Sequence, residues 1–190
     1  MFCLNSYGQT VEEYSNRGNS KANLGDYKDA IADHTKAIEL NPNDAVAYSM
    51  RGNSKVKLED YRGAIADYTK AIELDPNFAD AYFNRGISKY KLEDYSGAIA
   101  DYNKVIELNP NGADAYSFRG NSKAKLKDYR GAIADYTKAI ELNPNNAVAY
   151  ILRGFAKMIL NQKDSGCLDF SKAGELGNAN AYELIKKYCN

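Results

Sequence analysis

The side chains most often used in catalysis and metal binding are few and far apart in this 190-residue chain. It has one histidine, His34, and three cysteines, Cys3, Cys167 and Cys189. Disulfide frameworks and metal sites need such residues in sets at short, regular spacings. We therefore expect neither kind of site. Cys167 replaces an isoleucine of earlier segments and is predicted to be a small core residue, while Cys3 and Cys189 are expected to be free thiols in a reducing compartment.

Catalytic motifs give no stronger signal. The chain has no nucleophile elbow, phosphate-binding loop, metal-binding motif or paired-carboxylate motif. His34 stands where later segments carry tyrosine, so we interpret it as a half-buried packing residue. We expect no enzymatic activity, no catalytic or metal-binding residue, and no cofactor.

Charged residues recur with a regularity that points to ion pairing. An arginine, a lysine four residues later and an aspartate sixteen residues after the arginine are repeated five times, beginning at Arg17, Lys21 and Asp33. A partly buried guanidinium requires an anionic partner. We therefore predict an arginine–aspartate pair between two helices in every repeat. The alternative is that these cations form a basic surface for a ligand. It is disfavoured because the same arginine, lysine and aspartate recur in every repeat.

These residues belong to a 34-residue repeat that runs through the chain. Its markers are four prolines, five tyrosines and five glycines: Pro42, Pro76, Pro110, Pro144; Tyr14, Tyr48, Tyr82, Tyr116, Tyr150; and Gly18, Gly52, Gly86, Gly120, Gly154. A fixed period of this size indicates stacked supersecondary units. We number each repeat so that its proline is position 32.

Each repeat is predicted to contain two helices. In the second repeat, helical spacing of apolar residues runs over 45–57, and Asp60 is placed to cap a second helix that Pro76 terminates. Thr10 and Glu13 form a capping box before the first helix. A glycine inside a helix is unfavourable by about 1 kcal/mol relative to alanine. Its recurrence at position 8 therefore indicates close approach of the partner helix.

With an aromatic residue at position 4, small residues at positions 8, 20 and 27, tyrosine at 24 and proline at 32, the chain resembles the tetratricopeptide repeat family. The second repeat shows the pattern as Tyr48, Gly52, Ala64, Tyr68, Ala71 and Pro76. The resemblance implies an all-α, right-handed superhelical solenoid of antiparallel helix pairs. The expected boundaries are an N-terminal tail at 1–10, repeats at 11–44, 45–78, 79–112 and 113–146, a degenerate fifth repeat at 147–177, and a C-terminal capping helix at 178–190.

The resemblance also implies that the first helix of each repeat lines a concave groove for a protein or peptide ligand. Asparagine at position 9 could hydrogen-bond a ligand's backbone, and lysine at position 13 would favour an acidic peptide. We expect an apolar pocket between the third and fourth repeats. The candidate ligand-binding residues are Asn19, Ser49, Asn53, Lys57, Phe83, Asn84, Ile87, Tyr90, Lys91, Ser117, Phe118, Asn121 and Lys125.

One specialised role found among similar proteins is disfavoured. Some relatives clamp the C-terminal carboxylate of heat-shock chaperones with lysine at position 5, asparagine at 9, asparagine at 6 of the next repeat, and then lysine at 2 and arginine at 6 of the repeat after that. Counted from the first repeat, this chain has at those positions Ser15, Asn19, Met50, Asp80 and Asn84. The cationic members of the clamp are therefore missing.

Charge and hydropathy narrow the class of partner. Lys plus Arg and Asp plus Glu are both 25, so the formal net charge is zero and gives no bulk attraction to nucleic acid. No apolar run suits membrane insertion, and the N-terminal residues do not resemble a signal peptide, which favours a cytoplasmic location. The expected function is a protein-interaction scaffold. Self-association is the alternative, because the first helix of the fifth repeat is apolar on most sides: Ile151, Leu152, Phe155, Met158 and Ile159.

Overall fold

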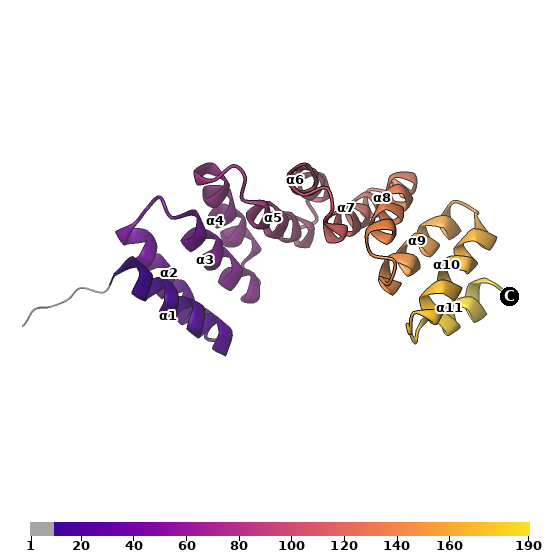
Figure 1. Cartoon of the computed structure of the whole chain (residues 1–190), viewed down its shortest axis with the longest axis horizontal. Coiled ribbons are helices and arrows are strands. Elements are labelled where there is room, and N and C mark those ends of the chain that lie inside the picture. The colour runs from indigo at the N-terminus through magenta and orange to yellow at the C-terminus, as the bar shows by residue number, and fades with distance from the viewer. Residues whose placement is uncertain (1–9) are drawn as a thin grey trace, which may run out of the picture. The chain divides into compact units, whose positions relative to one another are not determined.

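A computed structural model describes residues 10–190, which form helices joined by short loops, without a strand. They make two compact units, the first ending at Leu92 and the second spanning Glu93–Asn190 (Figure 1). The first unit contains α1 (Val11–Leu24), α2 (Tyr27–Leu40), α3 (Ala45–Lys57), α4 (Tyr61–Leu74) and α5 (Ala79–Lys91). The second contains α6 (Tyr95–Leu108), α7 (Ala113–Lys125), α8 (Tyr129–Leu142), α9 (Ala147–Ile159), α10 (Lys163–Glu175) and α11 (Ala181–Tyr188).

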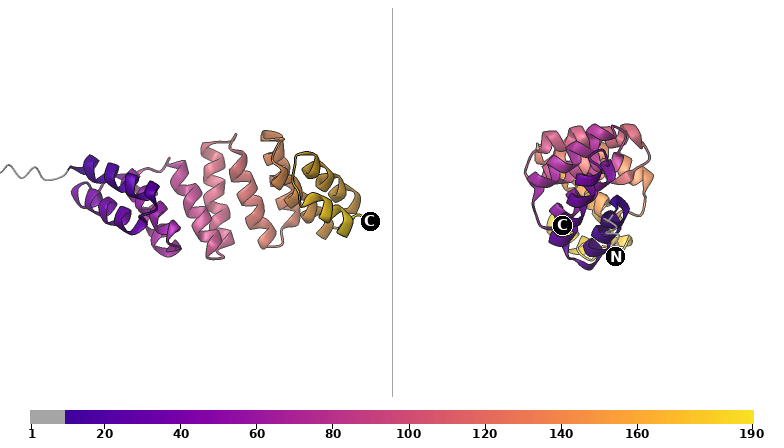
Figure 2. Two further views of the ribbon diagram at one scale, coloured as in Figure 1. Left: turned by 90° about the horizontal axis from the view of Figure 1, so that it is seen from below. Right: turned by 90° about the vertical axis from the view of Figure 1, so that its left-hand side faces the viewer.

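Neighbouring helices pack as antiparallel pairs within each unit. In the first unit, α1 pairs with α2 and α3 with α4, and α5 packs against α4 (Figure 2). In the second unit, α7 pairs with α8 and α9 with α10, while α6 packs against α7 and α11 against α10. The predicted all-α array of helix pairs with a terminal capping helix is confirmed.

Helix boundaries follow the capping residues of the sequence. Thr10 and Glu13 form the expected capping box at the start of α1. The Asp60 side chain accepts a hydrogen bond of 2.9 Å from the Gly63 amide at the start of α4, as predicted. At the other end, α4 stops at Leu74, two residues before Pro76.

The core of each hairpin is built from position 24 and its small neighbours. Tyr68 is 1% exposed, and Ala64 and Ala71 on the same helix are fully buried. A Cβ atom added to Gly52 would lie only 2.8 Å from the Tyr68 ring, so the ring occupies the space that any larger residue would need. The predicted close approach at position 8 is therefore confirmed here. Gly120 with Tyr136 and Gly154 with Phe170 repeat the arrangement.

The expectations for Cys167 and Cys189 were both wrong, since Cys167 is half-buried and disulfide-bonded rather than a core residue. Cys167 on α10 forms a disulfide with Cys189, which directly follows α11, and their Cα atoms are 5.8 Å apart. The turn after α10 brings the two residues together although 22 positions separate them in sequence. Cys189 is therefore not a free thiol, and the argument from free thiols for a reducing compartment no longer stands. Cys3 lies outside the described residues.

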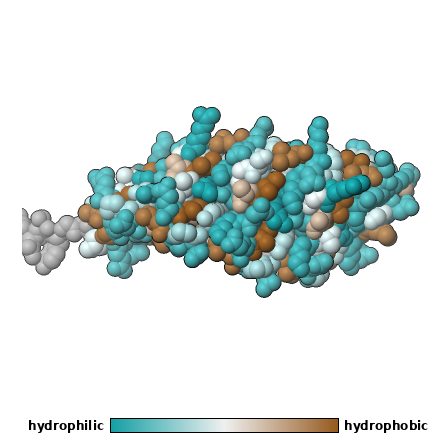
Figure 3. Space-filling model, turned by 90° about the horizontal axis from the view of Figure 1, so that it is seen from above, coloured by the Kyte–Doolittle hydropathy of each residue, from teal (hydrophilic) through white to brown (hydrophobic). Residues whose placement is uncertain are grey.

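The capping helix covers the end of the fifth repeat as predicted. Ala181 is fully buried, and the Tyr188 ring lies 5.9 Å from Phe155 and 6.4 Å from Phe170, measured between ring centroids. Apolar residues nevertheless stay exposed around this end of the chain. Ile159 is 54% exposed and Leu168 71%. Figure 3 shows one face of the molecule, on which hydrophobic atoms lie between hydrophilic ones.

Within residues 10–190, the helices are too short or too polar to cross a bilayer.

Candidate functional site

The repeated charges stabilise the helix pairs. In the second repeat, Arg51 donates to both oxygens of Asp67 at 2.7 and 3.0 Å, and Lys55 lies 2.7 Å from the same carboxylate. The same three-residue arrangement recurs in the first, fourth and fifth repeats. Asp67 is only 4% exposed, so its two cations compensate a buried charge. The predicted pairing is confirmed in these repeats. Their arginines and lysines therefore already have anionic partners within the protein and do not need one from a ligand.

Each arginine of this ladder also stacks on the tyrosine at position 4. The Arg51 guanidinium carbon lies 5.5 Å from the centre of the Tyr48 ring, and the other four repeats show separations of 5.0–5.5 Å. A cation over an aromatic face is attracted by the ring quadrupole. In the first repeat, hydrogen bonding from Arg17 lowers the pKa of Asp33 to about 2, with a smaller contribution from Lys21 and with burial acting in the opposite direction.

The asparagines at position 9 have a structural role that sequence reasoning missed. The Tyr68 hydroxyl donates to Asn53 Oδ1 at 2.7 Å, and Asn84 Nδ2 donates to the same oxygen at 3.2 Å. In the second unit, the Tyr136 hydroxyl donates to Asn121 Oδ1 at 2.8 Å. These amide oxygens therefore accept hydrogen bonds from buried tyrosine hydroxyls. Asn53 Nδ2 also donates to Met50 Sδ at 3.9 Å, so of the two amides only the Asn121 nitrogen is left to bind a ligand without losing a bond within the protein.

The serines at position 5 are less accessible than a ligand-binding role requires. Ser49 is 2% exposed, and the hydroxyl oxygen of Ser117 is closed to solvent. Both side chains are small enough to lie beneath their neighbours. In this fold the hydroxyls of Ser49 and Ser117 are therefore not open to a ligand.

A pocket opens between α3 and α5 in the first unit, with a volume of about 410 Å³. Four of the predicted site residues line it: Asn53, Lys57, Asn84 and Ile87. Val56 and the buried Tyr68 complete the lining. The first helices of the second and third repeats thus form a shared recess.

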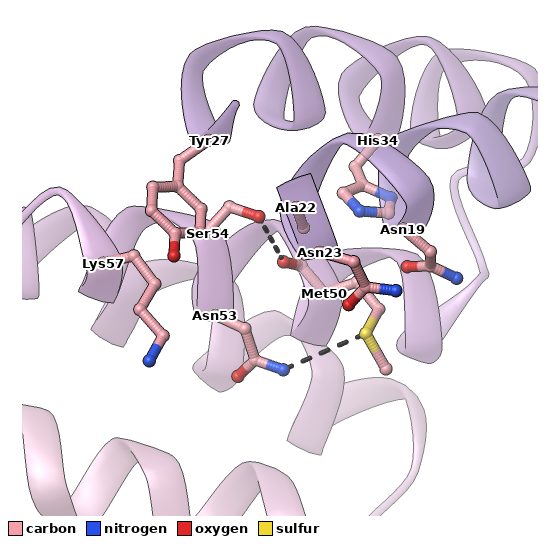
Figure 4. Close-up of a pocket in the computed structure, with 9 residues that line it drawn as sticks. All are labelled: Asn19, Ala22, Asn23, Tyr27, His34, Met50, Asn53, Ser54 and Lys57. Carbon is pink, nitrogen blue, oxygen red and sulfur yellow. Dashed lines mark hydrogen bonds between the residues drawn. The ribbon is translucent and has the colours of Figure 1, made fainter. Parts of the chain in front are cut away.

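A second pocket, of about 430 Å³, lies one repeat earlier between α1 and α3 (Figure 4). Its lining includes the predicted residues Asn19, Asn53 and Lys57, together with His34 from α2. His34 is 1% exposed, so the expectation of a half-buried residue was wrong. Neither ring nitrogen has a hydrogen-bond partner among the described residues, and burial lowers the pKa of the imidazole. The replacement of tyrosine by histidine at position 24 was the sequence signal for this difference.

The lysines at position 13 differ from the lysines at positions 11 and 26, which pair with carboxylates of the protein. Lys57, Lys91 and Lys125 are exposed and make no ion pair within residues 10–190. By contrast, the lysines at position 26 pair with a glutamate three residues later on the same helix, as Lys70 does with Glu73 at 3.1 Å. The position 13 lysines are therefore free to pair with a ligand's carboxylates.

The remaining predicted residues are divided between the two units. Phe83, Ile87 and Tyr90 are half-buried on α5 in the first unit. Phe118 belongs to α7 in the second unit, where its ring centroid lies 5.9 Å from that of Tyr102. The apolar pocket expected between the third and fourth repeats remains a prediction. Residues 10–190 also hold no cluster of three or more histidine, cysteine, aspartate or glutamate residues suited to a metal ion.

Comparison with known families agrees with this architecture. The model for the tetratricopeptide repeat matches residues 11–44, 79–111 and 113–146, and a second model described as a TPR repeat matches residues 52–92. These matches cover more than half of the chain, which therefore belongs to the tetratricopeptide repeat family.

Solved structures with the same fold include two kinds of protein. "Crystal structure of MamA" is 27% identical over 90% of this chain and 97% of its own, with a TM-score of 0.81. A MamA fragment from Desulfovibrio magneticus RS-1 is 22% identical over 90% and 97% of the two chains, with a TM-score of 0.85. YrrB, described as a TPR protein with an unusual peptide-binding site, is 24% identical over 93% and 92%, with a TM-score of 0.82. No curated protein sequence matches the chain.

Proposed function

We propose that this protein is an interaction scaffold that binds a peptide or protein segment along the first helices of its repeats. The observation that carries the proposal is that Lys57, which makes no ion pair within residues 10–190, lines two recesses between neighbouring repeats of the first unit. Lys91 and Lys125 are exposed lysines at the equivalent position of the next two repeats. The cations at positions 7, 11 and 26 pair with carboxylates of the scaffold. Those at position 18, Lys28, Arg62 and Arg130, make no ion pair within residues 10–190 but line neither recess. The partner is a protein rather than a nucleic acid, because the net charge of the chain is zero.

The recesses suit side chains of an extended segment. Each has a volume of about 400 Å³, with Ile87 and Val56 supplying apolar surface in one and Met50 in the other. Asparagine side chains and Lys57 line both recesses beside this apolar surface. Such a combination of an apolar floor with a few polar groups is typical of ligand sites.

The test compares two variants that lose the same three positive charges. The groove variant carries Lys57→Ala, Lys91→Ala and Lys125→Ala, and the matched control carries Lys36→Ala, Lys70→Ala and Lys138→Ala. Quantitative pull-downs from a lysate of the source organism would use both variants and the wild type. We expect a set of proteins retained by the wild type and the control but lost by the groove variant. Equal retention by all three would place the binding surface elsewhere.

Self-association is a second candidate, favoured by apolar residues that the capping helix leaves uncovered. Val148 is 57% exposed, Ile159 54% and Leu168 71%, all in the fifth repeat. Light scattering coupled to size-exclusion chromatography would test this candidate. A monomer at high micromolar concentration would exclude it.

A further inference from the structure

The pocket between α1 and α3 differs in chemistry from the pocket between α3 and α5, although equivalent positions line both. In the later pocket, the Tyr68 hydroxyl and the Asn84 amide both donate to Asn53 Oδ1. In the earlier pocket, His34 replaces the tyrosine, and Met50 replaces the second asparagine. Asn53 Oδ1 in the later pocket therefore accepts hydrogen bonds from within the protein, whereas the equivalent Asn19 Oδ1 in the earlier pocket accepts none from the described residues.

The histidine ring occupies the same place as the tyrosine rings of other repeats. A Cβ atom added to Gly18 would lie 2.8 Å from His34 Cε1, as one added to Gly52 would lie 2.8 Å from Tyr68 Cε1. The shorter imidazole lacks the hydroxyl that reaches position 9. As a result, Asn19 makes no side-chain hydrogen bond within residues 10–190, and both ring nitrogens of His34 are buried without a partner.

Buried polar atoms are nearly always hydrogen-bonded, so an unpartnered imidazole lining a pocket indicates a group still to be bound. Asn19, Asn23 and Lys57 around it can donate, whereas Asn53 already donates to Met50 Sδ at 3.9 Å and Ser54 to the Met50 carbonyl at 3.2 Å. Figure 4 shows Asn19 and Asn23 of α1 on the His34 side of the pocket, and Asn53 and Lys57 of α3 on the other. Asn23 and Lys57 likewise have no partner among the described side chains, and Asn23 stands where three other repeats carry lysine.

The charges near the pocket favour an anion. Lys57 is an unpaired cation at its edge, and no carboxylate lines it. The charged groups that act on His34 are Asp33, which pairs with Arg17 and Lys21, together with Asp44 and the opposing cation Arg51. A carboxylate accepts hydrogen bonds from amide, imidazole and ammonium donors together, whereas an amide ligand would leave the charge of Lys57 uncompensated.

We propose that this first-repeat pocket binds the carboxylate side chain of an aspartate or glutamate in an acidic peptide, through Asn19, Asn23, His34 and Lys57. The inference rests on the proposed function, because it assigns a ligand chemistry to one part of the same surface. A neutral His34 would donate one N–H at the closed end of the pocket, and Lys57 would supply the opposite charge at its mouth.

The test exploits the fact that His34 is the only histidine, so the imidazole ¹⁵N signals need no assignment by mutation. Labelled protein would be titrated with acetyl-Gly-Glu-Gly-amide and, as the matched neutral probe, acetyl-Gly-Gln-Gly-amide. We expect saturable shifts of the His34 ring nitrogens and of the Asn19 and Asn23 side-chain amides with the glutamate peptide. Because a tripeptide makes few contacts, its Kd should be on the order of millimolar, with the glutamine peptide weaker by about tenfold or more.

The variant His34→Tyr provides the second arm. This variant has the residue that the second repeat carries at the same position, and Gly18 leaves room for a six-membered ring. It should therefore fold, with a midpoint of thermal unfolding no lower than that of the wild type. Its hydroxyl should bind Asn19 as Tyr68 binds Asn53. We expect the glutamate-induced shifts of the Asn19 and Asn23 amides to be lost or weakened by about tenfold or more.

Three results would overturn the inference: no saturable shift, equal affinity for the two tripeptides, or undiminished binding by His34→Tyr. None of these depends on the three-lysine groove variant. If His34→Tyr keeps the lysate partners that the groove variant loses while neither tripeptide binds, the pocket inference fails and the proposed function stands. If neither variant loses a partner but the glutamate tripeptide binds selectively, the proposed groove fails and the pocket stands.

Discussion

The asparagine at position 9 belongs both to the scaffold and to the candidate site. Asn53 is half-buried, and its oxygen receives the hydroxyl of Tyr68, a side chain that is 1% exposed. An unpaired buried hydroxyl is unfavourable, because it has lost its hydrogen bonds to water. Truncating Asn53 therefore tests structure as well as binding.

We predict that Asn53→Ala lowers the free energy of unfolding by about 1–3 kcal/mol, since Tyr68 loses its acceptor. Tyr68→Phe removes the stranded hydroxyl, so adding Asn53→Ala to Tyr68→Phe should cost less than Asn53→Ala alone. Urea unfolding of the two single variants and the double variant would give the coupling energy. A coupling energy near zero would contradict the role assigned to this hydrogen bond.

At the scale of the helix pair, a buried carboxylate links the two helices of each described hairpin. Asp33 on α2 is 4% exposed and receives two hydrogen bonds from Arg17 on α1, at 2.6 and 2.8 Å. Because these interactions favour the charged form, the folded pKa of Asp33 lies at about 2, below its ordinary value of 3.8. Its contribution to stability is present above pH 4 and is lost as the pH falls toward 2.

We predict that Asp33→Asn is destabilising at pH 6 and that its effect shrinks as the pH falls toward 2. The loss in free energy of unfolding caused by Asp33→Asn should differ between pH 6 and pH 2 by no more than about 2 kcal/mol. The limit is set by solvent, which screens the pair because Arg17 is partly exposed. Asp29→Asn on the same helix is the matched control, since Asp29 is 70% exposed and lies 3.8 Å from Lys21. Urea unfolding at several pH values would measure both variants. An equal loss at pH 6 and pH 2.5 for Asp33→Asn would contradict the ion-pair account.

The last helix is held by a covalent bond as well as by packing. The helix α11 has only eight residues, too few to be stable alone, and Cys189 at its end is bonded to Cys167 on α10. We predict that Cys189→Ser accelerates amide exchange in α11, because closing a loop of this length stabilises by about 3 kcal/mol in the chain-entropy model. Exchange in α1–α4 should be unchanged, as repeats are stabilised mainly by their neighbours. Hydrogen–deuterium exchange with Cys3→Ser as the control would measure this, and unaltered exchange in α11 would show that packing alone suffices.

At the scale of the whole molecule, the array needs a cover for the apolar end of its last hairpin. Phe170 and Ala173 are fully buried, and α11 packs on the helix that carries them. We predict that a chain ending at residue 177 self-associates at micromolar concentration, because the newly exposed apolar surface is favourable to bury. The full chain, in which α11 covers this surface, should associate more weakly by about tenfold or more in the same light-scattering experiment. A monomeric truncated chain would mean that α11 is dispensable as a cover.

The sequence alone determined the parts of this protein that depend on local repetition. The period of 34 residues, the capping aspartates and the prolines predicted the helices, because each signal acts within a few residues along the chain. The Arg17–Asp33 pairing was also predictable, because a partly buried guanidinium requires a nearby anion and the spacing placed one on the adjacent helix. The capping helix followed from the apolar stripe after Gly177.

Only the tertiary structure decided which of these residues face solvent and which are already bonded. Ser49 is buried, Asn53 accepts a hydrogen bond from Tyr68, and Cys189 forms a disulfide with Cys167. None of these could be read from the spacing in the sequence, because each depends on the angle between packed helices. His34 is the clearest case. In the sequence it is a histidine at position 24, where the next three repeats have tyrosine. In the fold its shorter ring leaves polar atoms without hydrogen-bond partners beside a pocket.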